Sequence, residues 1–87
     1  MFRVRWERRA LDELTDLWTR VDSTLRNAIT VASNEIDQLL RTNPLDLSES
    51  RPNGRRILFV PPLGLTFRVD GQTVSVLRIW LFRKRAK

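Results

Sequence analysis

The spacing of apolar residues changes twice along this chain of 87 residues, and this change restricts the folds that it can adopt. Residues 2–6 alternate between apolar and charged side chains, which is typical of a β-strand. Between residues 8 and 42 the apolar residues recur every three or four positions, as on one face of a helix. From residue 56 onward the alternation of strands returns. This order of elements predicts an α+β fold.

The helical stretch should form two helices rather than one. A single helix over residues 8–42 would be roughly 50 Å long, whereas a compact domain of this length has a radius of gyration of about 12 Å. We therefore expect a turn at residues 21–24, where Asp22 or Ser23 can cap the second helix. The second helix should end at Asn43, which precedes a proline. Three acid–base pairs four residues apart should support the exposed helix faces: Asp16–Arg20, Asp22–Arg26 and Asp37–Arg41.

The C-terminal half predicts three strands, over residues 56–60, 65–69 and 72–80, after a polar connection at residues 44–55. We expect the first turn at residues 61–64. Asp70-Gly71 is the strongest hairpin signal in the chain. A two-residue loop there places residues opposite one another as follows: Val69 and Gln72, Phe67 and Val74, Leu65 and Val76.

This pairing puts apolar side chains on the face that packs on the helices, namely Leu65, Phe67, Val74 and Val76. Beyond Ser75 the alternation reverses, so we expect a bulge near Leu77. The predicted order is β-α-α-β-β-β, an N-terminal helical hairpin on a mostly antiparallel sheet. Residues 1–87 should form one domain.

The chain contains no cysteine, histidine or tyrosine. Disulfides, thiolate zinc sites, histidine-ligated metals and the commonest general base are therefore excluded, and we expect no metal and no cofactor. The apolar runs are far shorter than the roughly 20 residues that span a bilayer, and the first residues contain no apolar signal segment. We expect a cytoplasmic protein with no membrane partner.

Charge is distributed unevenly, which suggests an anionic partner for the C-terminal half. Residues 7–49 contain nine acids and five bases, whereas residues 50–87 contain nine bases and one acid, Asp70. The candidate binding residues are Arg55, Arg56, Arg68, Arg78, Arg83, Lys84 and Arg85. Trp80 and Phe82, beside the basic tail, are candidate partner contacts.

Structural roles remain open for several of these residues. Arg55 and Arg56 could instead protect a strand edge against aggregation. Arg68 and Arg78 lie within strands, where pairing with a helix carboxylate is an equally good interpretation. The residues after Phe82 could form a solvated terminus.

In this order of elements the chain resembles the RelE/ParE family of bacterial type II toxins. The segments that carry this resemblance are Arg3-Val4-Arg5-Trp6-Glu7, Ala10-Leu11-Asp12-Glu13-Leu14-Thr15-Asp16-Leu17-Trp18, Leu39-Leu40-Arg41-Thr42-Asn43-Pro44, Phe59-Val60-Pro61-Pro62, Phe67-Arg68-Val69-Asp70-Gly71 and Val74-Ser75-Val76-Leu77-Arg78-Ile79. The resemblance implies a cognate acidic antitoxin, and one of two activities: cleavage of mRNA on the ribosome, or poisoning of DNA gyrase by binding.

The sequence differs from the usual pattern of the family in two places, and both bear on the choice between these two activities. Members usually open the central strand with an aromatic–arginine pair, where this chain has Leu63 and Gly64. In the ribonuclease branch that arginine contacts the substrate phosphate. Many relatives also have a histidine after the last strand, where this chain has Leu81 or Phe82.

Proton-transfer groups are scarce, because arginine stays protonated at working pH. The only weak catalytic candidates are Arg68, Arg83 and Lys84. We therefore favour target binding of the gyrase-poisoning kind over RNA cleavage. A third possibility is a non-toxic protein that uses the toxin fold to bind nucleic acid or protein.

Overall fold

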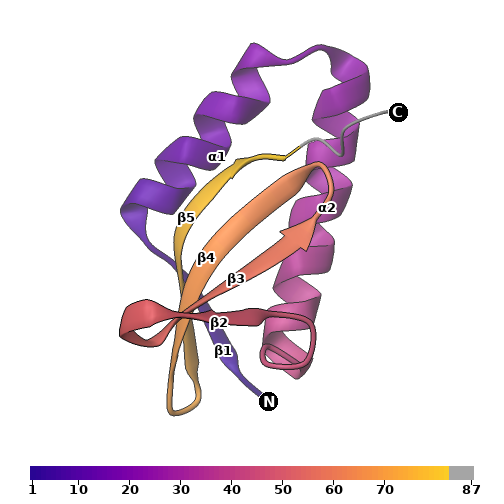
Figure 1. Cartoon of the computed structure of the whole chain (residues 1–87). Helices are drawn as coiled ribbons and strands as arrows, with labels where there is room; N and C mark the ends of the chain where they lie inside the picture. Colours follow the sequence, from indigo (N-terminus) through magenta and orange to yellow (C-terminus); the bar gives the residue numbers. More distant parts are fainter. Residues whose placement is uncertain (83–87) are drawn as a thin grey trace, which may run out of the picture.

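A five-stranded sheet with two helices on one face makes up the fold in the computed structural model, which describes residues 1–82 (Figure 1). The helices are α1 (Arg8–Arg20) and α2 (Ser23–Thr42). The strands are β1 (Arg3–Trp6), β2 (Glu49–Arg51), β3 (Arg55–Val60), β4 (Leu63–Asp70) and β5 (Thr73–Leu81), and a short 3-10 turn spans Pro52–Gly54. The strand order is β1-β5-β4-β3-β2, with β1 parallel to β5 and all other pairs antiparallel. The expected α+β class is confirmed.

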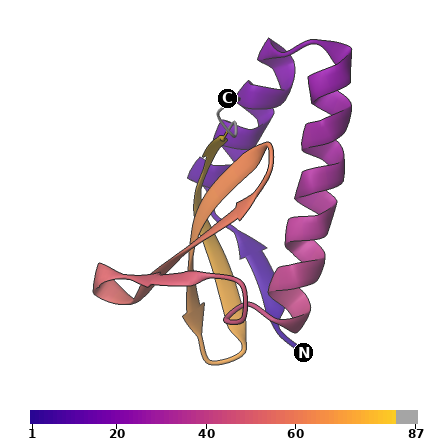
Figure 2. The same cartoon turned by 45° about the vertical axis from the view of Figure 1, so that its right-hand side comes forward.

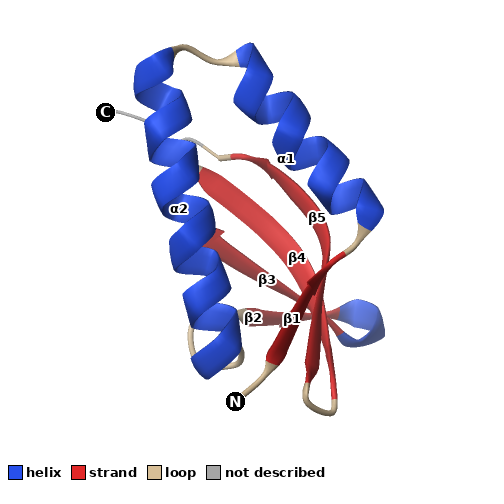
Figure 3. Ribbon diagram, turned by 180° about the vertical axis from the view of Figure 1, so that it is seen from behind, coloured by secondary structure: helices blue, strands red, loops and turns tan. Residues whose placement is uncertain are grey.

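The core lies between the helices and one face of the sheet, as Figure 2 shows from the side. Leu65, Phe67, Val74 and Val76 are completely buried on that face, as the alternation predicted. They pack against apolar residues of α2, including Ile36. Burial of each such side chain stabilises the fold by about 1.5–3 kcal/mol. The opposite face of the sheet carries no helix, and we call it the open face. It faces the viewer in Figure 1, whereas Figure 3 shows the side that the helices cover.

The helical hairpin turns where the sequence predicted. Asp22 is the N-cap of α2, and its carboxylate accepts a hydrogen bond of 2.9 Å from the backbone N–H of Leu25. The prediction of an Asp22–Arg26 ion pair is wrong, because Asp22 lies outside the helix with an extended backbone. Arg26 instead donates to the carbonyls of Trp18 and Val21. The other two predicted pairs form, Asp16–Arg20 at 3.0 Å and Asp37–Arg41 at 2.7 Å.

The hairpin between β4 and β5 differs from the prediction by one residue in its loop. The loop residues are Gly71 and Gln72, and Asp70 pairs with Thr73. Gly71 has a φ of +59°, which suits the first position of a type II′ turn. Val69 therefore lies opposite Val74 rather than Gln72. The partners of Val69 and Phe67 each move by two residues, so these side chains keep their predicted faces. The partner of Leu65 moves by three residues, from Val76 to Ile79, because of the bulge described next.

The predicted bulge is confirmed at Leu77. Phe67 pairs with Val76 and Thr66 pairs with Arg78, which leaves Leu77 without a partner across the strand. Two further expectations need correction. The turn after β3 contains only Pro61 and Pro62, since Leu63 already pairs with Val60 within the sheet. The connection at residues 44–55 was expected to contain no strand, but it contains β2 and the start of β3.

The edge of the sheet beside β5 is shared by β1 and α1. The pairing of β1 with β5 covers Thr73 to Val76 only. Beyond that point α1 lies along β5 (Figure 1), and the carboxylate of Glu13 accepts a hydrogen bond of 3.0 Å from the N–H of Ile79. Neither helix is long and apolar enough to cross a membrane within residues 1–82.

Candidate anion-binding site

Four arginines lie in one lateral row across the open face of the sheet. Strand pairing places Arg5 of β1 beside Ser75, Ser75 beside Arg68, Arg68 beside Arg55, and Arg55 beside Arg51. All four arginines are exposed. Paired residues on neighbouring strands share a face, so the four guanidinium groups lie on the same side of the sheet. We call these four residues the arginine row.

The two arginines at the centre of this row lack acidic partners. Arg5 forms an ion pair with Glu7 at 3.5 Å, and Arg51 forms one with Glu49 at 3.1 Å. Arg55 and Arg68 form no ion pair with any carboxylate in residues 1–82. Like charges directly opposite one another destabilise a sheet. This pair therefore carries an electrostatic cost that no ion pair within residues 1–82 offsets.

A hollow of about 330 Å³ opens beside this pair, between the start of α1 and the middle of the sheet. Its lining residues are Glu7, Arg9, Arg55, Arg68, Leu77 and Arg78; we call it the arginine hollow. Leu77 and Arg78 are adjacent in sequence, and strict alternation would send them to opposite faces. The bulge at Leu77 allows both to line the hollow.

Arg78 is held by a helix carboxylate. Its Nε donates to Glu13 at 2.8 Å, and Arg9 lies 4.0 Å from the same carboxylate. Burial opposes ionisation of Glu13, but hydrogen bonds from Ile79 N–H and Arg78, with the charges of Arg78 and Arg9, lower the pKa of its carboxyl. Arg78 therefore already has a structural partner, one of the two interpretations that the sequence left open.

Arg56 lies apart from the arginine row. It pairs with Phe67, a core residue, and so belongs to the face that the helices cover. Its guanidinium donates to Ser48 Oγ at 2.7 Å, to Ser48 O at 3.0 Å and to Leu45 O at 3.4 Å. Adjacent in sequence, Arg55 and Arg56 thus have different surroundings: Arg55 faces solvent, and Arg56 fixes the loop before β2.

The other end of the open face is aromatic. Phe59, Gly64 and Trp80 lie side by side on β3, β4 and β5. A Cβ atom at Gly64 would lie 2.7 Å from Trp80 Nε1 and 3.0 Å from Phe59 Cδ1. The ring of Phe82 packs on Phe59 with centroids 4.6 Å apart. Both predicted partner contacts, Trp80 and Phe82, are half-buried in this cluster.

The structure thus brings together Arg55, Arg68 and Arg78 and separates Arg56 from them. Arg83, Lys84 and Arg85 lie outside the described residues. Sequence reasoning missed Glu7, a carboxylate that lines the arginine hollow. The signal in the sequence that could have identified Glu7 was its position directly after the alternating residues 2–6. No group of three potential metal ligands occurs in residues 1–82.

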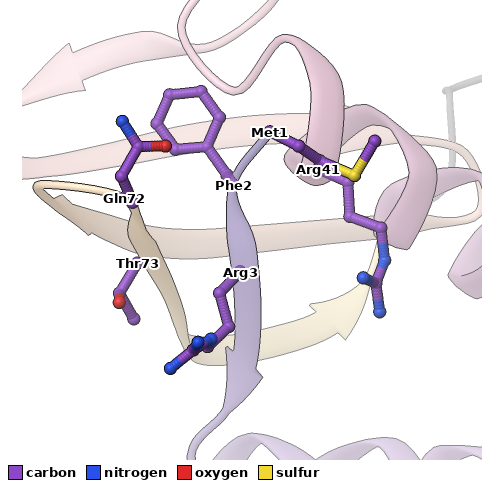
Figure 4. Close-up of a pocket in the computed structure, with 6 residues that line it drawn as sticks. All are labelled: Met1, Phe2, Arg3, Arg41, Gln72 and Thr73. Carbon is purple, nitrogen blue, oxygen red and sulfur yellow. The ribbon is translucent and has the colours of Figure 1, made fainter.

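A second hollow, of about 430 Å³, lies at the far end of β1 and contains none of the predicted binding residues. Figure 4 shows its lining residues, with Arg3 and Arg41 extending to opposite sides of β1. Arg41 is occupied by its ion pair with Asp37. This hollow therefore offers no convergent set of charges comparable to the arginine hollow.

The fold is that of the RelE and ParE toxin structures, which confirms the predicted resemblance at the level of fold. The solved "Chromosomal ParDE TA system from P. aeruginosa" includes a chain that matches with a TM-score of 0.75 at 21% identity, over 95% of this chain and 98% of that one. The toxin–antitoxin complex RelBE2 from Mycobacterium tuberculosis matches with 0.63 at 20% identity, over 94% and 98%. The isolated E. coli RelE toxin matches with 0.62 at 16% identity, over 98% and 88%. No family model and no curated protein sequence matches the chain.

Proposed function

We propose that this protein is the toxin of a type II toxin–antitoxin pair and that it acts by binding an anionic cellular target through the open face. The observation that carries the proposal is that Arg55 and Arg68 lie side by side and form no ion pair within residues 1–82, on a fold shared with RelE and ParE toxins. Exposed like charges that destabilise the sheet are best explained by a ligand that neutralises them.

Target binding without cleavage is the favoured activity, with gyrase as the preferred target. The resemblance implies that a ribonuclease of this family contacts the substrate phosphate with an arginine at the position of Gly64. Here the rings of Trp80 and Phe59 fill the space that a side chain at this position would need. This contact supports a toxin that does not use the ribonuclease phosphate site.

Ribosome-dependent cleavage of mRNA is the second candidate, and one observation favours it. Glu7 lines the arginine hollow together with Arg55 and Arg68. A carboxylate there could accept the proton of a ribose hydroxyl, while the guanidinium groups stabilise the phosphate charge. Glu7 is, however, already engaged in an ion pair with Arg5 at 3.5 Å.

An acidic antitoxin is the proposed partner. A segment that is disordered alone and folds on the toxin as a helix or an added strand would bring carboxylates to the basic residues. Of the described strands, β2 and β1 lie at the edges of the sheet. Covering the open face would neutralise the toxin by blocking access of the target.

The test is induced expression without an antitoxin, followed by growth measurement, mapping of mRNA 5′ ends and an assay of DNA supercoiling. We expect growth arrest and loss of gyrase activity without new mRNA ends. Discrete ribosome-dependent cuts that disappear in a Glu7→Gln variant would establish the second candidate. Normal growth at high expression would contradict a toxin role and favour an interaction module.

A further inference from the structure

We propose that the protein forms a two-fold dimer in which β2 of one copy pairs antiparallel with β2 of a second copy, with Ser50 at the centre. The inference does not depend on the toxin role. It starts from the position of β2 at an edge of the sheet, where no strand within residues 1–82 pairs with its outer side (Figure 1). All three residues of β2, Glu49–Arg51, are exposed. Such an edge presents unpaired backbone N–H and C=O groups, which are a template for pairing with another chain.

The charges of β2 select a second copy as the occupant of this edge. Glu49 and Arg51 lie at equal distances on either side of Ser50 and point to the same face of the sheet. In an antiparallel pair centred on Ser50, Glu49 of each copy therefore lies directly opposite Arg51 of the other. Opposite Cβ atoms are roughly 4.5–5.5 Å apart, closer than the roughly 6.4–6.8 Å between residues two apart on one strand. The ion pair of 3.1 Å within each copy thus becomes part of a network of four alternating charges.

The same charges determine the register of the pairing. Antiparallel pairing centred on Glu49 or on Arg51 places like charges opposite one another, which destabilises a sheet. The other edge strand, β1, contains two arginines, Arg3 and Arg5, and no acidic residue. Two copies of β1 would therefore bring only positive charges together. Of the two edges, β2 is the one that is self-complementary, as a two-fold interface requires.

The residues around β2 limit the contact to a dimer and add apolar burial. Pro52 follows β2 directly and has no backbone N–H to continue the pairing. Leu47, two residues before β2, is 66% exposed. Because residues at equal distances from Ser50 meet, Leu47 approaches the 3-10 turn of the second copy, where its burial stabilises the dimer. The interface uses the same residues on both copies, so it closes on itself and does not propagate.

Symmetry determines how the two copies are oriented. The two-fold axis that relates antiparallel strands of one sheet is perpendicular to that sheet. Both open faces therefore point to the same side, and both helical hairpins point to the other. The five strands of each copy form one continuous sheet, and the arginine rows of the two copies meet at β2. The dimer thus presents both rows on one surface.

Sedimentation velocity of the full chain, from micromolar to millimolar concentration, measures the equilibrium between monomer and dimer. We expect a dimer that weakens as salt is added. Glu49→Arg and Arg51→Glu each place like charges opposite one another, and each alone should weaken the dimer about tenfold or more. An equimolar mixture of these two variants should restore it, because one β2 is then doubly positive and the other doubly negative. The controls Asp16→Arg and Arg20→Glu make the same changes in net charge at an exposed pair on α1 and should leave the dimer unchanged.

A second measurement reports the register directly. The chain contains no cysteine, so Ser50→Cys introduces a single thiol, at the proposed two-fold axis. Opposite residues of an antiparallel pair have Cα atoms roughly 4.5–5.5 Å apart, which a disulfide can span. Oxidation with diamide should therefore crosslink the Ser50→Cys variant into a covalent dimer. An Arg20→Cys control at the same concentration should remain uncrosslinked.

Three results would overturn the proposal. The first is a wild-type protein that stays monomeric up to millimolar concentration. The second is a dimer that neither charge reversal weakens, which would assign the contact to a surface other than β2. The third is a pair of reversed variants, shown to be folded by circular dichroism, whose mixture does not dimerise. Because these measurements use purified protein, their outcome is separate from that of the growth and gyrase assays that test the toxin role.

Discussion

The indole of Trp80 lies over Gly64 on the neighbouring strand, with Nε1 at 2.7 Å from the place of a Cβ atom. Phe59 approaches the same place from β3 at 3.0 Å. The two rings meet edge to face, with centroids 6.3 Å apart. A glycine here is therefore required by packing, since its φ is not in the left-handed region. The contact closes the start of β4 to any side chain.

Gly64→Ala should lower the free energy of unfolding by roughly 1–3 kcal/mol, because the new methyl group forces Trp80 or Phe59 to move. Urea denaturation measures this cost. In a Trp80→Ala background the nearest obstacle is gone, and the same substitution should cost clearly less. An equal cost in both backgrounds would show that Trp80 does not impose the glycine.

Glu13 should make stability depend on pH. Its folded pKa lies below the ordinary value of 4.5, so the ionised carboxylate stabilises the fold above the unfolded pKa. That contribution disappears as the pH falls through the folded pKa. Glu13→Gln should destabilise the protein at pH 7, by on the order of 1 kcal/mol, and the loss should become smaller as the pH is lowered to 3. Denaturation at both pH values measures the difference, and Asp12→Asn, at an exposed pair, serves as the control.

A pH-independent difference between wild type and Glu13→Gln would contradict this role for the carboxylate. It would mean that the hydrogen bond to Ile79 acts equally well with a neutral acceptor.

Arg55 and Arg56 should respond to substitution in opposite ways. Arg56→Ala removes three hydrogen bonds to the loop before β2 and should lower the free energy of unfolding by roughly 1–2 kcal/mol. It should also speed hydrogen exchange at residues 45–50 and leave growth arrest on induction nearly unchanged. Arg55→Ala should weaken growth arrest without loss of stability. If Arg56→Ala instead weakened growth arrest at full stability, the division between the two faces would be wrong.

The turn between the helices should depend on the guanidinium of Arg26. This group lies 4.5 Å from the ring centre of Trp18 and donates to the carbonyls of Trp18 and Val21 at 3.0 and 3.1 Å. Arg26→Lys keeps the charge but loses the paired donors, and should lower the free energy of unfolding by about 1 kcal/mol. Arg20→Lys, at an exposed pair with Asp16, should have an effect close to zero. Equal effects of the two substitutions in thermal denaturation would contradict the role of Arg26.

Local patterns predicted most of the fold. The periodicity of residues 8–42 and the two candidate caps, Asp22 and Ser23, were sufficient to predict the helical hairpin, because capping and amphipathicity act within a few residues. The reversal of alternation after Ser75 predicted the bulge at Leu77. β2 was missed, although Asn53-Gly54 is a hairpin signal; both residues have positive φ, and they connect β2 to β3.

The candidate site could not be predicted in the same way, because it depends on which strands are neighbours. The arginine row joins residues 5, 51, 55 and 68, and nothing in their spacing along the chain shows that they meet. The separation of Arg56 from Arg55 follows from alternation, but its binding to Ser48 depends on the course of the loop. The contact of Trp80 with Gly64 likewise needed the register of β4 and β5.

Growth after induction of the Arg55→Ala/Arg68→Ala variant, without an antitoxin, tests the central claim most directly. The account predicts that wild type and the Arg20→Ala/Arg41→Ala control stop growth. Cells that accumulate the Arg55→Ala/Arg68→Ala protein in the same amount should continue to divide. Growth arrest by this variant as complete as that by wild type would contradict the claim that the toxin acts through the centre of the arginine row.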